Sequence, residues 1–102
     1  MSNAANPKDV KKSEEKEKSK RERELLDLIT ILQLQEGRRL LWRLMSETGV
    51  FKSVWEPSAK IHYNAGQQDF GHFIMAEIVA ADQDKLFLMM SEAKKKEEIN
   101  NV

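Results

Sequence analysis

The side chains best suited to acid–base or metal chemistry in this sequence are two histidines and a scattered set of carboxylates. His62 and His72 have no carboxylate cluster at metal-ligand spacing beside them. The candidate acids show no spacing that identifies a catalytic pair; they are Glu36, Glu47, Asp69 and Glu77. The sequence also contains no cysteine, phosphate-binding glycine loop or zinc motif. It therefore predicts a protein that is not an enzyme and that needs no metal or cofactor.

A cluster of basic and aromatic residues is the strongest candidate for a binding site. It consists of Arg38, Arg39, Trp42 and Arg43. Arg38 precedes Trp42 by four residues, so on a helix its guanidinium could stack on the indole. Arginine and tryptophan are favoured at the centres of protein interfaces. We therefore predict a partner-binding surface here, with Trp55 in the following loop as a further member.

A structural role for the same cluster remains open. In that alternative Glu36 pairs with Arg39, Glu47 pairs with Arg43, and Trp42 seals the following loop onto the helices. Stacking of RNA or single-stranded DNA on Trp42 is a further alternative. It is disfavoured because 17 lysines and arginines balance 17 acidic residues, which removes the bulk attraction for nucleic acid.

Helical periodicity defines the elements that must position these residues. Apolar side chains recur at helical spacing in four stretches. The positions are Leu25, Leu28, Ile29 and Leu32; Leu40, Leu41, Leu44 and Met45; Phe70, Phe73, Ile74, Ile78 and Ala81; and Leu86, Met89, Met90 and Ala93. We predict an all-α fold, a small bundle of three to four helices, with a helical domain at residues 24–93.

A charged extension and a polar tail flank this domain. Asn6 and Pro7 have the pattern of a helix start. The lack of large apolar residues from Lys11 to Glu24 nevertheless leaves residues 1–23 open as either a helical or a disordered extension. Residues 94–102 are predicted to be a polar C-terminal tail.

Glycine, proline and aspartate mark the expected breaks between helices. We predict a kink or one-turn break at Gln35–Gly37, a helix end at Gly49 and a packed loop at about residues 50–65. A third helix is expected from a cap at Asn64, with Gly66 and Gly71 allowing a turn or a close helix approach. Asp82 is the preferred cap of the last helix, with Asp84 as the alternative. The small residues Ala76 and Ala80 are also expected to face a neighbouring helix.

The domain is small enough that association is expected to help stabilise it. A single core of this size contributes only a few kcal/mol, and the apolar arc of Leu25–Leu34 is wider than one neighbour covers. We therefore expect self-association or docking on a larger partner. No apolar run approaches the roughly 20 residues needed to span a bilayer, so no membrane contact is expected. The lack of cysteine and of a secretory signal favours an intracellular location.

Four motifs resemble those of a family of small tailed-bacteriophage proteins first named from a Bordetella phage. They are Glu36–Trp42, Gly49–Phe51, Asn64–Gly71 and Leu86–Met90, and the resemblance covers about residues 24–93. The family's second motif usually carries glutamate, glycine and two arginines where this chain has Ala65, Gly66, Gln67 and Gln68. The resemblance implies no activity. It implies a virion-associated or assembly protein, located in the host cytoplasm during infection or in the virion, with itself or a phage structural protein as partner. A small nucleic-acid-binding or host-directed regulator is the alternative.

Overall fold

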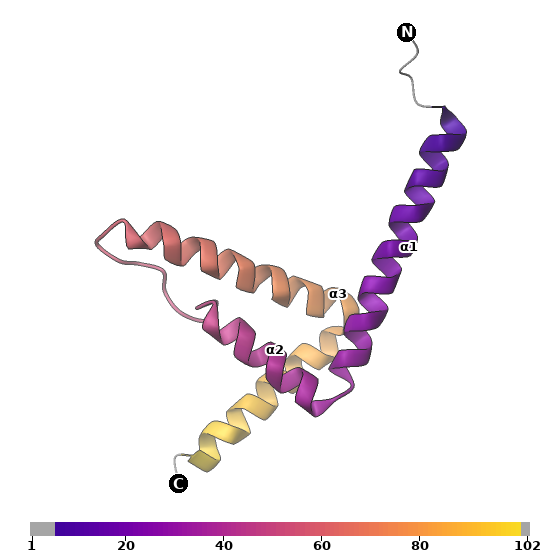
Figure 1. The fold of residues 1–102 in the computed structure, drawn as a ribbon. Helices are drawn as coiled ribbons and strands as arrows, with labels where there is room; N and C mark the ends of the chain where they lie inside the picture. The colour runs from indigo at the N-terminus through magenta and orange to yellow at the C-terminus, as the bar shows by residue number, and fades with distance from the viewer. Residues whose placement is uncertain (1–5, 101–102) are drawn as a thin grey trace.

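The computed structural model describes residues 6–100 and consists there of helices and connecting loops. The helices are α1 (Pro7–Leu32), α2 (Gln35–Glu47) and α3 (Lys60–Asn100) (Figure 1). Asp82 has extended backbone angles and divides α3 into two segments. We call residues 60–81 the α3 N-segment and residues 83–100 the α3 C-segment. The all-α prediction is confirmed, whereas residues 1–5 of the predicted extension and residues 101–102 of the tail lie outside the described chain.

Helix α1 runs without interruption through the charged stretch. The Asn6 side chain accepts a hydrogen bond from the Lys8 amide at 2.9 Å, and Pro7 occupies the first turn. This cap satisfies one of the amide groups that a helix start leaves without a partner. Of the two alternatives for the charged extension, the structure has the helical one from Pro7 onward.

The three helices meet at one junction, which contains the core. Its buried side chains come from every helix and from the loop after α2; they are Leu32, Met45, Val50, Ile78, Leu86 and Met89. Leu28 and Leu41 pack against this cluster as predicted. Leu40 and Leu44, expected on the same face as Leu41 and Met45, are 47% and 44% exposed, so that part of the prediction was wrong.

The break between α1 and α2 falls at Gln33 and Leu34, slightly before the predicted position. Gly37 lies in the first turn of α2, where a Cβ would collide with the carbonyl oxygen of Ile31. The glycine therefore allows α2 to start close against the end of α1, whereas the prediction made it the break itself. Gly49 does end α2, with a φ of 74°, as predicted.

The loop between α2 and α3 is shorter than predicted because α3 begins at Lys60 and not at Asn64. The Ser58 hydroxyl accepts a hydrogen bond from the Lys60 amide at 3.3 Å, which caps the helix start. The sequence prediction missed this cap because Pro57, next to Ser58, indicated that the loop continues. Packing of the loop is confirmed only in part, since Val50 is buried whereas Trp55 is 71% exposed.

The α3 N-segment packs through part of the predicted face, because Ile78 is buried and Ile74 and Ala81 pack against the core as predicted. Gly71 is buried, and a Cβ there would collide with the Thr48 hydroxyl and lie 2.8 Å from Val50 Cβ, so the predicted close approach is confirmed at this position. Phe70 and Phe73, predicted to be buried, are 59% and 56% exposed. They lie 100° and 200° around the helix from Gly71, at 100° per residue, and therefore point away from the junction.

Two further predictions about this helix differ from the structure, and a third is confirmed. A Cβ at Gly66 would meet no atom within 4 Å, so this glycine serves neither a turn nor a close approach within the chain. Ala76 and Ala80 are exposed, although close packing was expected of them. Asp82 was assigned correctly, because its side chain accepts a hydrogen bond from the Asp84 amide at 3.1 Å and caps the α3 C-segment.

The molecule is elongated, because helices extend outward from the junction (Figure 1). Its radius of gyration is 19.1 Å, whereas a compact domain of about 100 residues has about 13 Å. Against six buried apolar side chains, sixteen large ones in the described chain are at least 38% exposed. The core is therefore small, and much apolar surface remains available for contacts.

Candidate functional site

An open groove lies between α2 and the α3 C-segment, and it contains most of the predicted binding residues. Its volume is about 1070 Å³. The apolar part of its lining consists of Leu40, Trp42, Leu88, Met89, Ala93 and Ile99. The charged part consists of Arg38, Arg39, Arg43, Lys95 and Lys96, with Glu36, Glu92 and Glu97. The groove thus combines apolar surface with a net excess of cations.

Arg38 lies at the inner end of the groove and joins all three helices. Its Nε donates to Glu92 Oε1 at 2.7 Å, and its Nη1 donates to the Leu32 carbonyl at the end of α1 at 2.7 Å. Only 12% of the Arg38 side chain and 22% of the Glu92 side chain are exposed. The hydrogen bond from Arg38 is the main cause of the lowered pKa of the Glu92 carboxyl. Arg38 therefore has a structural contact in place of the predicted stacking on Trp42.

Trp42 is half-buried and packs in two directions. Its ring stacks on Phe51, with centroids 5.0 Å apart and planes at 26°. Phe51 follows Gly49, so the stacking holds the start of the loop against α2. The remaining indole surface lines the groove. Trp42 thus has the sealing contact that the structural alternative predicted and also contributes surface for a ligand.

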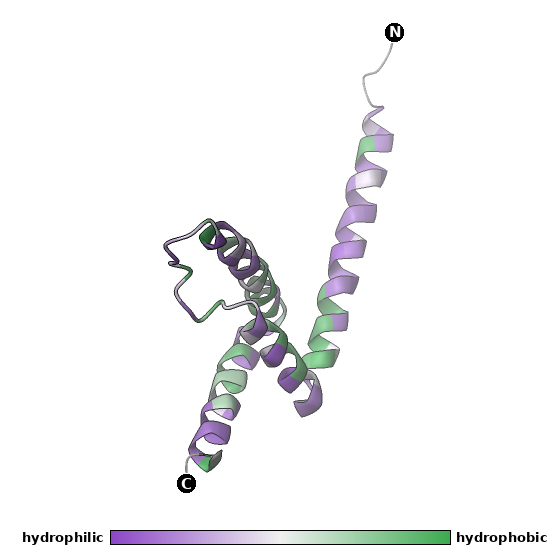
Figure 2. Cartoon of the chain, turned by 60° about the vertical axis from the view of Figure 1, so that its left-hand side comes forward, coloured by the Kyte–Doolittle hydropathy of each residue, from purple (hydrophilic) through white to green (hydrophobic). Residues whose placement is uncertain are grey.

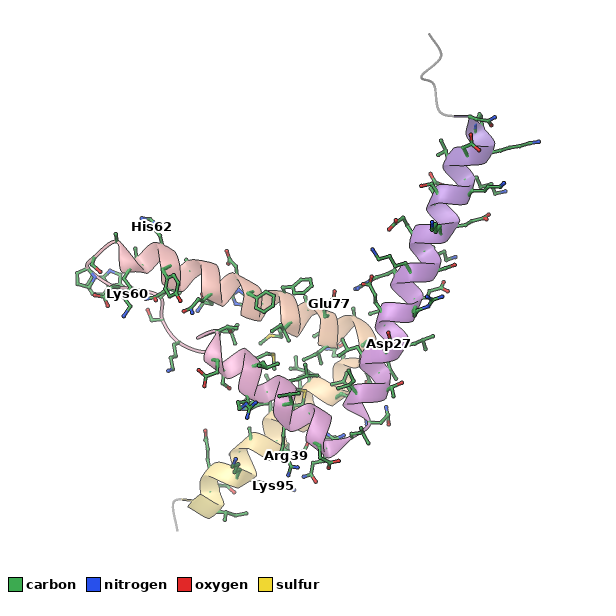
Figure 3. All side chains as sticks on the ribbon, viewed as in Figure 1. Asp27, Arg39, Lys60, His62, Glu77 and Lys95 are labelled. Carbon is green, nitrogen blue, oxygen red and sulfur yellow. The ribbon has the colours of Figure 1, made fainter. Side chains whose placement is uncertain are left out.

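The exposed cations of the groove come from two helices that are far apart in sequence. Arg39 and Arg43 lie on α2, and Lys95 and Lys96 on the α3 C-segment. Figure 3 labels Arg39 and Lys95, which lie on these two helices at the same end of the molecule. Arg39 is only 4.0 Å from Glu36, and both side chains are more than 60% exposed, so this pair leaves the guanidinium largely available.

Trp55, the fifth predicted residue, lies outside this groove. It belongs to the loop before α3 and is not among the residues that line the groove. The sequence prediction also missed the whole second wall, above all Leu88, Lys95 and Ile99. The Lys94–Lys96 run was predicted only to belong to the polar C-terminal tail. Its position one turn or more after Leu88 and Met89 on the same helix was the signal that could have identified the wall.

Between residues 6 and 100, no group of three or more histidines and carboxylates is placed to hold a metal ion. None of the helices in this range is both long and apolar enough to cross a bilayer.

Comparisons with known proteins do not assign a function to this chain. No family model, curated protein or solved structure matches this chain. The resemblance to the phage family therefore stays a prediction from the four sequence motifs.

Proposed function

We propose that this chain is a non-catalytic protein-interaction module that binds an acidic, amphipathic helix of a partner protein in the groove between α2 and the α3 C-segment. The observation that carries the proposal is the combination of an apolar lining and exposed cations in one open groove. An amphipathic helix offers an apolar stripe for such a lining and places its charges at the edges.

The charge balance of the groove favours an acidic partner. Arg38 is neutralised by Glu92, and Arg39 lies near Glu36. The remaining lining charges are Arg43, Lys95 and Lys96 against Glu97, a net charge of about +2. Complementary charges at the rim of an interface mainly raise the association rate and fix the register of binding.

The sequence resemblance extends this proposal to a biological setting. It suggests a phage-encoded protein that acts in the host cytoplasm during infection, in particle assembly or as a component of the virion. The partner is then a phage structural protein. Recovery of the chain in purified particles, measured by quantitative mass spectrometry, tests the virion part of the proposal separately from the groove.

Charge reversal in the groove tests the binding site. The double variant Arg43→Glu/Lys95→Glu should lose the partner on affinity purification from infected cells, because the groove becomes anionic. The variant Lys12→Glu/Lys16→Glu is the matched control, since it changes the net charge equally on the exposed first half of α1. A synthetic peptide of the partner's acidic segment should bind the groove variant at least about tenfold more weakly in fluorescence anisotropy.

Two outcomes would contradict the proposal. Equal recovery of the partner by the groove variant and the control would exclude the groove as the binding site. Tight binding of a single-stranded DNA or RNA oligomer that falls steeply with salt, and that is lost in the groove variant, would instead support the nucleic-acid alternative.

A further inference from the structure

The α3 N-segment carries a stripe of exposed aromatic rings on the side away from Gly71. We call Tyr63, Phe70 and Phe73 the aromatic stripe; their exposed fractions are 64%, 59% and 56%. The rings of Phe70 and Phe73 stack with centroids 6.0 Å apart. Together with Gly66, these residues follow the spacing of three, four and three residues that two packed helices present to each other.

Gly66 leaves a gap in the middle of this stripe. A Cβ at this position would meet nothing within 4 Å, so the surface above the glycine is open. The stripe ends at Glu77, because Arg21 of α1 donates to both carboxylate oxygens there, at 3.0 and 2.6 Å. The free part of the stripe therefore runs from Tyr63 to Phe73, with Gly66 and Phe70 on either side of its midpoint.

We infer that the aromatic stripe is a dimer interface that takes a second copy of this chain, with the two α3 N-segments antiparallel. In this arrangement Phe70 of each copy fills the gap at Gly66 of the other, and Tyr63 of each packs on Phe73 of the other. The inference goes beyond the proposed function, because the stripe is a separate surface from the groove.

The stripe is complementary to itself under a two-fold axis. Antiparallel helix pairs place the first core position of one helix opposite the second core position of the other. Here that rule sets Tyr63 against Phe73 and Phe70 against Gly66, so each large ring meets a partner of suitable size. Such a contact uses the same patch on both copies, as two-fold dimers require.

Charge at the ends of the segment supports the same orientation. Lys60 lies at the loop end of the α3 N-segment and Glu77 at the junction end (Figure 3). Their separation along the helix is about 26 Å at 1.5 Å per residue. An antiparallel second copy separates the two Lys60 side chains and brings each toward the Glu77–Arg21 pair of the other copy, whereas a parallel copy would place the two Lys60 charges together.

The exposed area is large enough for a dimer. The accessible surface of the chain is 8149 Å², whereas a folded monomer of this mass has about 5900 Å². The polar first half of α1 accounts for part of the excess. The three aromatic rings alone leave on the order of 350 Å² per copy to be covered. The flanking helix surface can supply the rest of the about 800 Å² per partner of a standard interface.

Mass measurements with matched variants test this interface in the full chain. Wild-type protein should sediment as a dimer that dissociates on dilution. Gly66→Lys and Phe73→Lys should raise the dissociation constant by about tenfold or more, because each places a charge within the apolar contact. Phe87→Lys is the matched control, since Phe87 lies on the α3 C-segment with the same 56% exposure as Phe73, and it should leave the dimer unchanged.

Gly66→Lys keeps the test independent of folding, because the monomer has open space at this position. Its helical content, measured by circular dichroism, should match that of the wild type. The groove variant Arg43→Glu/Lys95→Glu should also stay dimeric, which separates this inference from the proposed function. A wild-type protein that stays monomeric throughout the dilution series, or a dimer that is weakened equally by Phe87→Lys, would overturn the inference.

A zero-length carbodiimide cross-link tests the orientation without any substitution. Because Lys60 and Glu77 of one copy are too far apart to react with each other, a Lys60–Glu77 cross-link can form only between copies. Mass spectrometry of the cross-linked dimer should detect this link. A cross-linked dimer without it, joined elsewhere, would overturn the antiparallel arrangement.

Discussion

Two helical arms extend from the same junction, and their surfaces differ in kind. In residues 7–21 of α1, Val10 is the only large apolar residue. Figure 2 shows this part of the helix as mostly hydrophilic. The α3 N-segment instead exposes Tyr63, Phe70 and Phe73. A helix that is polar on all sides loses little by remaining in water, whereas exposed aromatic rings leave favourable burial unused. The comparison indicates that only the second arm needs a partner.

The polar arm, residues 7–21 of α1, is attached to the rest of the molecule at its C-terminal end and is stabilised by charge pairs within the helix. Arg21 binds Glu77 at the point where α1 reaches the α3 N-segment. Glu14 with Lys18 and Glu17 with Arg21 are spaced four residues apart in the favourable direction, worth about 0.2–0.5 kcal/mol per pair. The arm can therefore stay helical without any tertiary contact before Arg21.

The largest expected effect on stability distinguishes the two faces of the α3 N-segment. Gly71→Leu should lower the free energy of unfolding by about 1–3 kcal/mol or more, because the side chain would enter the contact with Thr48 and Val50. Gly66→Ala adds a Cβ that meets no atom of its own chain, so at a concentration where the chain is monomeric it should add up to about 1 kcal/mol through helix propensity. Urea denaturation of both variants checks the difference, and equal stabilities would show that the two faces do not differ in packing.

The glycines also show what the sequence could predict of this fold. Helix type, the Asn6 and Asp82 caps and the Gly49 helix end depend on a few neighbouring residues, and all were predictable. The role of Gly37 depends on how closely two helices approach, which no local pattern encodes. For the same reason, periodicity alone could not decide whether Phe70 or Gly71 faces the junction.

Prediction of the candidate site was limited in a similar way. The cluster on α2 was identified from residue types, and Arg39 and Arg43 do lie on an open surface. The contact of Arg38 with Glu92 joins residues 54 positions apart and could not be inferred from local spacing. The second wall of the groove is equally remote in sequence, because its position depends on the Asp82 kink and on the packing of Leu86 and Met89 in the core.

An effect of similar size should distinguish the junction from the groove rim. Arg38→Met should lower stability by about 1.5–3 kcal/mol, because Glu92 and the Leu32 carbonyl lose a charged hydrogen-bond donor. Arg39→Met removes an exposed arginine and should change stability by about 0.5 kcal/mol or less. Thermal unfolding of both variants measures the contrast. Similar melting temperatures would mean that the Arg38 contact contributes no more than a surface pair.

The pH dependence of stability provides an internal control for the comparison of wild type with Arg38→Met. Folding lowers the pKa of Glu92 below its ordinary value of 4.5, chiefly through the hydrogen bond from Arg38. The contribution of this carboxylate to stability is therefore complete above pH about 4.5 and is lost as the pH falls through the folded pKa. The stability difference between wild type and Arg38→Met should shrink over that range. A difference that does not change with pH would exclude Glu92 as its source.

The smallest expected effect is that of removing the polar arm. A chain that begins at Arg21 keeps the pair with Glu77 and every residue of the buried core. Its free energy of unfolding should change by less than about 0.5 kcal/mol, which corresponds to a melting-temperature shift of at most about 4 °C. The variant Arg21→Met in the full-length chain is the matched control, because it removes the anchor and keeps the arm. A loss of many degrees on truncation, with little change in Arg21→Met, would mean that the arm packs on something before Arg21 and that the two arms are alike in needing a partner.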